Sequence, residues 1–170
     1  EYPPDLLQRV QPMIHQHLQQ FGRILTKQIL PALKKEHICL YYGEPIKDEH
    51  MEIVREYFLS KVLSFLQPVL LRKENQAEIF LENNALYFVV EIEATDQPGK
   101  RSYALLNIPS ANLPRFLELP IIEEDHHILF LDDVIRTNLQ EVFPRFIIHG
   151  AYSVKMTRDA EMEVEDEFLG

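Results

Sequence analysis

The chain has 170 residues, of which 46% are hydrophobic and 26% charged, and these ordinary globular values exclude a disordered, collagen-like or disulfide-rich chain. Its length suits one domain, or one domain with a helical arm. The 17 basic and 27 acidic residues give a net charge of -10, which argues against a nucleic-acid-binding protein, since such proteins usually show a basic surplus or patch. The single cysteine, Cys39, permits no internal disulfide and fits a reducing compartment.

The two ends of the chain predict a piece of a longer protein. The start, Glu-Tyr-Pro-Pro, lacks the basic and apolar regions of a secretory signal and contains no initiator Met. Residues 159–170 carry six acids and no base, and no closing element follows them. No apolar run reaches the roughly 18 residues that a bilayer span needs, so we predict no membrane span.

Apolar side chains recur at three- and four-residue steps over residues 5–35, which predicts a long amphipathic helix. Asp5 follows two prolines and is a suitable N-cap. Pro12 and Pro31 interrupt the pattern, so we expect a start or bend near the first and an end or kink near the second. Such a helix needs a partner for its apolar stripe, which includes Leu18, Phe21 and Leu25.

Residues 37–42 form a short β-like run, after which Asp48 caps a second amphipathic helix that Pro68 ends. From about residue 69 the hydrophobic period changes to that of strands. Strands are then predicted at residues 78–81, 85–92 and 101–108. Their short connections, including the Asp-Gln-Pro-Gly turn at 96–99, predict an antiparallel meander.

Three prolines interrupt residues 109–120, and no element is assigned between them. A short strand is predicted at residues 128–131, followed by a helix that Asp132 or Asp133 caps and that ends at Phe143. The remaining sequence, from residue 146 through residue 164, is predicted to be extended.

The densest group of candidate metal ligands is residues 123–127, Glu-Glu-Asp-His-His, with Asp132 and Asp133 nearby. Carboxylates and imidazoles together suit zinc or manganese, which makes a metal-dependent hydrolase one hypothesis. The spacing matches no known ligand pattern, however. Neighbouring residues of an extended segment point to opposite faces, so His126 and His127 cannot easily share one ion. We favour a solvated loop.

The other reactive residue types lack suitable neighbours. His15 and His17 are two residues apart on a predicted helix and therefore lie on different faces. Cys39 lies in a predicted buried strand without an evident base, so we expect a core thiol. Five glycines in the chain provide no phosphate-binding loop, and no G-x-S-x-G elbow occurs. The chain contains no self-sufficient catalytic constellation.

One run near the C-terminus is different in kind. Arg158 and Asp159 are adjacent in a predicted extended segment, so each needs its own partner. Surface ion pairs, worth about 0–1 kcal/mol each, are the plain explanation. Residues 152–161, Tyr-Ser-Val-Lys-Met-Thr-Arg-Asp-Ala-Glu, nevertheless resemble the signature strand in the middle, or head, domain of the large polyphosphate kinases. Members of that family carry a similar Met-Thr-Arg-Asp-Ala-Glu run.

Three further segments agree with that family in order and spacing. Residues 101–109 resemble the family strand that ends in Ile-Pro or Val-Pro, and residues 113–116, Leu-Pro-Arg-Phe, match its Leu/Val-Pro-Arg-Phe turn. Residues 131–136 with Phe143 resemble its Asp-capped helix that ends in a Phe. Residues 1–35 are similar, more loosely, to the last long helix of the family's N-terminal domain.

The resemblance implies a parent enzyme that moves the terminal phosphate of ATP reversibly onto inorganic polyphosphate, through a phosphohistidine and with magnesium. Its catalytic histidines and phosphate-binding arginines belong to two C-terminal domains that are not in this chain. None of the seven histidines here matches the catalytic motif, so no catalytic residue, metal or cofactor is assigned to the fragment. The family's Pro/Phe-rich loop is not evident in residues 68–82. The head domain mainly supports dimer assembly and frames the active-site region, and the candidates for that framing are Thr157, Arg158 and Asp159.

We therefore predict an α+β fold with N-terminal long helices followed by a mainly antiparallel sheet with one packed helix. Residues 1–36 are predicted to be a helical arm from the end of the N-terminal domain, and residues 37–170 most of the middle domain. The predicted function is a non-catalytic scaffold of a cytoplasmic, homo-oligomeric kinase, with peripheral membrane attachment of the parent left open. Its partners would be the parent's other domains, with Leu18, Phe21 and Leu25 as candidate assembly residues. The alternative is a stand-alone interaction module that docks through residues 5–35.

Overall fold

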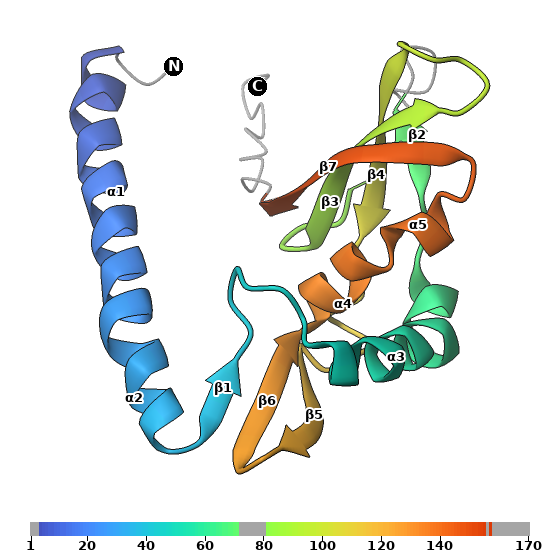
Figure 1. Ribbon diagram of the computed structural model, residues 1–170. Coiled ribbons are helices and arrows are strands. Elements are labelled where there is room, and N and C mark those ends of the chain that lie inside the picture. Colours follow the sequence, from blue (N-terminus) through green and yellow to red (C-terminus); the bar gives the residue numbers. More distant parts are fainter. Residues whose placement is uncertain (1–3, 72–80, 156, 158–170) are drawn as a thin grey trace, which may run out of the picture. The chain divides into compact units, whose positions relative to one another are not determined.

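The computed structural model describes residues 4–71, 81–155 and 157, and its elements confirm the α+β fold class (Figure 1). Two compact units interleave along the chain. The first unit takes the residues up to Ile53 together with Phe116–Phe130, and the second takes Val54–Arg115 and the residues from Leu131 onward. The predicted division after residue 36 concerns the domains of a longer enzyme and stays a prediction.

The predicted N-terminal helix is present and is nearly continuous. Helix α1 covers Pro4–Ile24, a wider π-type turn covers Leu25–Ile29, and α2 covers Leu30–Lys35. Pro31 has no backbone N–H to donate, and the wider turn directly before it relaxes the regular hydrogen-bond pattern there. Pro12 lies inside α1 without ending it. Among the helices that the structure describes, none combines the length and apolarity that crossing a bilayer requires.

The first unit contains a three-stranded sheet that was not predicted as a separate sheet. Its strands are β1 (Ile38–Leu40), β5 (Phe116–Ile122) and β6 (Asp125–Phe130), in the order β1-β6-β5. Strand β1 runs parallel to β6, while β5 and β6 form an antiparallel hairpin. Pro120 lies within β5, an edge strand, where the register shifts and where a missing N–H is tolerated.

A buried cluster of ring side chains lies in the core of the first unit. The backbone N–H of Lys47 donates to the Tyr41 hydroxyl, at 3.2 Å, and that hydroxyl lies 2.9 Å from Nδ1 of His50. Nε2 of His50 lies 2.8 Å from the carbonyl oxygen of Pro120, which can only accept, so Nε2 donates and Nδ1 accepts. The His127 ring packs against His50 with 4.8 Å between ring centres. The buried His50 therefore has both nitrogens satisfied while neutral.

The second predicted helix has three parts. Helix α3 covers Asp48–Tyr57, a π-type turn (η2) covers Phe58–Val62, and a 3-10 turn (η3) covers Leu63–Phe65. Asp48 and the following acid lie in the first turn, where the partial positive charge of the helix N-terminus favours them.

The second unit is built on a four-stranded antiparallel sheet in the order β2-β4-β3-β7. Its strands are β2 (Val69–Leu71), β3 (Leu86–Ala94), β4 (Arg101–Asn107) and β7 (Phe146–Lys155). The β3–β4 meander and the last strand through Lys155 are confirmed. The strand predicted at 78–81 falls mostly outside the described residues, and so does the extension after residue 157.

One face of this sheet forms the core of the second unit. Phe88, Val90 and Ile92 alternate along β3 and are fully buried, and Ala104 and Leu106 of β4 lie opposite Val90 and Phe88 in register. Alternation of this kind places one apolar set on one side of the sheet. This apolar face of the sheet needs helices or loops to cover it.

Helices α4 (Leu131–Thr137) and α5 (Leu139–Val142) supply that cover and are buried through Leu131, Val134, Ile135, Leu139 and Phe143 (Figure 1). The single helix predicted here is broken at Asn138. The side-chain amide of Asn138 donates to the carbonyl of Val134 at 2.8 Å, which satisfies a helix-end acceptor and ends α4. Because α4 begins at Leu131, Asp132 and Asp133 lie in its first turn and are not its caps.

The buried ring cluster leads us to predict how the free energy of unfolding depends on pH. Burial lowers the pKa of the His127 imidazole from its ordinary 6.5, so the unfolded chain takes up this proton at a higher pH than the folded chain does. The free energy of unfolding should therefore fall as the pH drops from about 7 through 6.5 toward the lower folded pKa, by at most about 1.4 kcal/mol per pH unit from this residue.

His127→Phe should flatten this dependence in urea unfolding between about pH 7.5 and 5.5. The groups facing His127 are His50, Tyr41, Asp125 and Lys47, and all stay in place in this variant. His126→Gln, on the exposed side of the same strand, serves as the matched control and should keep the wild-type slope. An unchanged slope in His127→Phe would contradict the prediction.

Candidate functional site

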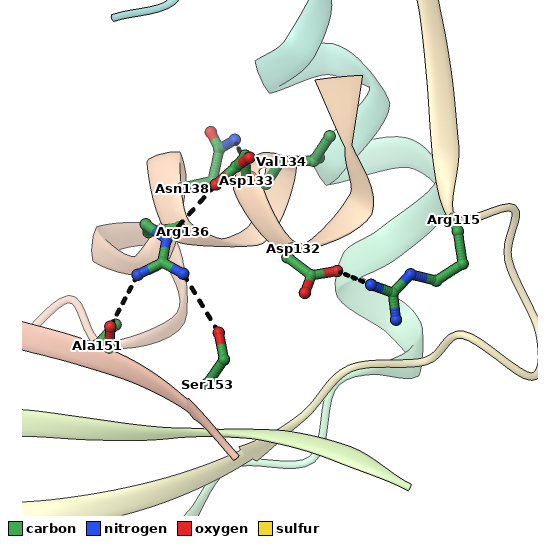
Figure 2. A network of polar contacts seen from close by, with 8 residues as sticks. All are labelled: Arg115, Asp132, Asp133, Val134, Arg136, Asn138, Ala151 and Ser153. Atoms are coloured by element: carbon green, nitrogen blue, oxygen red, sulfur yellow. Dashed lines mark hydrogen bonds and ion pairs between the residues drawn. The ribbon is translucent and has the colours of Figure 1, made fainter. Parts of the chain in front are cut away.

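Two of the segments that resemble family motifs meet at the start of α4 (Figure 2). Nη2 of Arg115 lies 3.1 Å from Oδ1 of Asp132, and the backbone N–H of Leu131 donates to the Arg115 carbonyl at 2.9 Å. Arg115 and Leu131 flank residues 116–130, which belong to the first unit. These contacts therefore fix the two points at which the chain leaves and re-enters the second unit.

The Arg115–Asp132 pair is more buried than a typical surface ion pair. The side chains are 35% and 19% exposed, and Oδ1 of Asp132 is buried without a well-formed hydrogen bond. The charge of the Arg115 guanidinium is thus what compensates this oxygen. Removing one partner of such a pair leaves an uncompensated buried charge, which costs more than the pair itself contributes.

Arg136 connects α4 to the edge strand β7. Its Nη1 donates to the carbonyl of Ala151 at 2.7 Å, and its Nη2 donates to Oγ of Ser153 at 3.3 Å (Figure 2). Its guanidinium carbon lies 4.9 Å from the centre of the Phe88 ring on the neighbouring strand. A third family-like segment, the one that begins at residue 152, is therefore attached to the same helix.

Asp133 completes this group, which we call the α4 junction: Arg115, Asp132, Asp133 and Arg136 with their partners Ala151 and Ser153. Burial raises the pKa of the Asp133 carboxyl, and the neighbouring Asp132 carboxylate adds to the rise. Arg136, whose Nε lies 3.5 Å from Oδ1 of Asp133, opposes it. Asp132 lies beside Arg115 and Asp133 lies beside Arg136, so the negative and positive charges of the junction compensate one another.

A groove of about 700 Å³ lies elsewhere in the second unit, near η3 and one end of β3 and β4. Asn107 shapes it, since its Oδ1 accepts from the N–H of Gln67 at 2.7 Å and its Nδ2 donates to the Phe65 carbonyl at 2.8 Å. The described residues that line it include several amide and hydroxyl side chains and Glu82, and none of these described residues is a Lys, Arg or His.

The predicted framing residues are only partly described. Thr157 follows β7, is exposed and lies outside regular structure, whereas Arg158 and Asp159 lie outside the described residues. The predicted assembly residues Leu18 and Phe21 lie on α1 with 64% and 65% of their surface exposed. Leu25, in the turn after α1, is half-buried. The roles of these residues stay predictions.

The candidate metal ligands of residues 123–133 do not converge on one point. His126 lies 3.6 Å from Glu118, and the buried His127 bonds through Nδ1 to the Asp125 carbonyl. The Asp125 carboxylate is engaged by His37 at 3.0 Å. Within the part of the chain that the structure describes, no three His, Cys, Asp or Glu side chains lie where they could hold one metal ion together.

Cys39 is half-buried on the short strand β1, where we had expected full burial. The reason is that β1 is an edge strand of the three-stranded sheet. Burial and a hydrogen bond to Asp125 raise the pKa of the Cys39 thiol, which opposes thiolate formation. The expectation of an unreactive thiol agrees with this environment.

The chain is similar to known proteins over most of its length. A family model described as the polyphosphate kinase middle domain matches residues 49–169. The chain belongs to the polyphosphate kinase family. It is 32% identical to the polyphosphate kinase of Vibrio cholerae serotype O1 over 167 residues, which cover 95% of this chain and 23% of that protein. The Yersinia pestis polyphosphate kinase is 30% identical over 167 residues, covering 95% and 24%.

The fold agrees with this assignment. The crystal structure of polyphosphate kinase from Porphyromonas gingivalis superposes with a TM-score of 0.84 and 31% identity, over 93% of this chain and 24% of that one. The chain thus spans about a quarter of the length of these polyphosphate kinases. All four motif segments, and with them the α4 junction, lie within the matched middle domain.

Sequence reasoning found the motif segments but missed their contacts. Arg115 and Asp132 are separated by a whole hairpin, and Arg136 reaches a strand 15 residues further on. The available signal was that arginines and aspartates sit inside the family-like segments of a chain whose net charge is -10. In such a chain, an arginine close to acids is well placed to pair internally.

The Arg115–Asp132 pair can be tested by a double-mutant cycle. Arg115→Met and Asp132→Asn should each lower the free energy of unfolding by about 1–3 kcal/mol, since each leaves a partly buried polar partner unpaired. The double variant should lose clearly less than the sum.

The matched control is Arg55 with Glu141, a more exposed pair at 2.8 Å, whose coupling should not exceed about 1 kcal/mol. Urea unfolding of all variants supplies the measurement. Additivity of the Arg115 and Asp132 effects within about 0.3 kcal/mol would refute the coupling.

Proposed function

We propose that this chain is a non-catalytic, scaffolding part of a polyphosphate kinase that would transfer the terminal phosphate of ATP reversibly to inorganic polyphosphate. The observation that carries the proposal is the α4 junction. The charged residues of the family-like segments bond to one another and to β7, and so hold the domain together. ATP, magnesium and polyphosphate would then be handled by other domains of the complete enzyme.

Four of the seven histidines support the same proposal. A phosphoryl-accepting histidine needs a nitrogen that a phosphate can reach. His50 and His127 are buried, His37 faces Asp125, and His149 bonds to Glu93 through Nε2 at 2.8 Å. None of these residues lies in a segment that resembles the family's catalytic motif.

The net negative charge of the chain also supports the proposed scaffolding role. A domain with a net charge of -10 repels free polyphosphate over a Debye length of about 8 Å at physiological salt. Among the described residues that line the groove near η3, none carries a cationic side chain that would offset this repulsion. A supporting domain has no need to attract the polymer, whereas a domain that binds it does.

The direct test is an activity assay on the purified 170-residue chain. Incubated with radiolabelled ATP, magnesium and a polyphosphate primer, it should form no polyphosphate and acquire no label. The Porphyromonas gingivalis enzyme provides the positive control. Polymer synthesis, or labelling of any of the seven histidines, would refute a purely supporting role.

We also propose that the chain self-associates through α1. The apolar side chains Met13, Ile14, Leu18 and Phe21 are each more than half exposed, and an extended apolar surface of this kind usually has a partner. The same observation favours the alternative function, an interaction module that docks through residues 5–35. The length of the native reading frame separates the two functions.

Sedimentation velocity over a range of concentrations tests the self-association. The wild-type chain should shift to a larger species as concentration rises, and the combined change Leu18→Ser with Phe21→Ser should abolish that shift. Tyr103→Ser, an exposed aromatic on β4, is the matched control and should behave as wild type. A wild-type chain that stays monomeric at high concentration would refute the proposal.

A further inference from the structure

We propose that Arg136 is a positioning residue that holds the last part of strand β7, residues 151–155, against helix α4. The claim about strand position stands on geometry alone. The claim that this position matters for phosphate transfer rests on the proposed function.

Arg136 bonds to residues in the last part of β7. Its two terminal nitrogens donate to the Ala151 carbonyl and to the Ser153 hydroxyl, four residues before Thr157 (Figure 2). In register, Ala151 lies opposite Val90 and Ser153 opposite Phe88 on β3. The guanidinium therefore rests over a cross-strand pair, with Phe88 beneath it at 4.9 Å.

The strand that Arg136 binds is an edge strand of the sheet. Strand β7 is the last in the order β2-β4-β3-β7, so among the described strands only β3 pairs with it. It also carries a register shift opposite Glu91 and Ile92, which interrupts the ladder before the final stretch. Strand ends with one neighbour open locally at low cost, so a side-chain bond from α4 has a large effect there.

Arginine has the geometry for this task and lysine does not. The planar guanidinium donates to two acceptors at once while one face rests on an aromatic ring. Asp133, one turn earlier in α4, lies 3.5 Å from Nε and constrains the other side of the group. An ammonium group at the same position would keep the charge but could not hold both acceptors in this fixed arrangement.

The first experiment measures backbone amide exchange by NMR in the 170-residue chain. Arg136→Gln should speed exchange of the amides of residues 151–155 by at least about tenfold, the effect of losing a charge-assisted hydrogen bond, while the β3–β4 ladder changes much less. It should also shift the resonances of Val154 and Lys155. Arg136→Lys should recover only part of the protection.

Arg101→Gln is the matched control, because Arg101 makes a 2.7 Å bond to Glu91 in the same sheet. It should leave exchange at residues 151–155 near the wild-type rate. Unchanged exchange there in Arg136→Gln would overturn the proposal. So would an equal acceleration across the whole sheet, because Arg136 would then stabilise the domain without positioning the strand.

The second experiment uses the complete enzyme that contains this chain. Arg136→Gln should lower kcat for polyphosphate synthesis at least about tenfold with KM for ATP nearly unchanged, and Arg136→Lys should restore part of kcat. Local exchange without any change in kcat would keep the positioning role of Arg136 and refute its link to catalysis. Activity of the isolated chain in the earlier assay would instead refute the proposed scaffolding function.

Discussion

The second unit depends on covering one apolar sheet face. Strand β3 places Phe88, Val90 and Ile92 on this face, and β4 adds Ala104 and Leu106, all fully buried. Each of the larger side chains in this set contributes about 1.5–3 kcal/mol to folding only if water is kept away from it. Helices α4 and α5 provide the cover with Leu131, Val134, Ile135, Leu139 and Phe143. The position of α4 is therefore the constraint from which the polar contacts of this unit follow.

Two arginines fix α4 in that position. Arg115 pairs with Asp132 in its first turn, and Arg136 from its last turn bonds to β7. Both arginines are thus used inside the domain, in a chain where acids outnumber bases by 27 to 17. A domain that binds a polyanion needs free cationic groups on its surface. The internal use of these arginines is the physical basis on which we propose a supporting role for this chain.

The core of the first unit differs from that of the second, because it contains polar rings. Its core contains the polar rings of Tyr41, His50 and His127, and these are accommodated because their polar atoms bond to one another and to backbone groups. A neutral imidazole that donates through one nitrogen and accepts through the other can be buried at modest cost. We therefore expect the stability of this core to depend on pH, whereas the core of the second unit is mostly apolar, with Asn138 as its buried polar residue.

Local patterns in the sequence were sufficient to predict the long helix, the β3–β4 meander and strand β7. Each of these depends on side-chain periodicity and on short connections between neighbours in the chain. The family-like segments were equally visible, because a motif is a local property. Strand β5 was missed because two prolines flank or interrupt it, and an edge strand tolerates them. The break at Asn138 was missed because it depends on a side-chain bond to a helix-end carbonyl.

Sequence alone therefore determined the fold class, the family and the elements whose signals are periodic. Only the tertiary structure decided that β1 pairs in parallel with β6, that the strands form two sheets, and which groups Arg115 and Arg136 contact. These pairings join residues that are distant in the chain, such as Ile38 and His126. Their pairing is selected by burial and charge compensation in the folded molecule, and no periodicity along the chain records that choice.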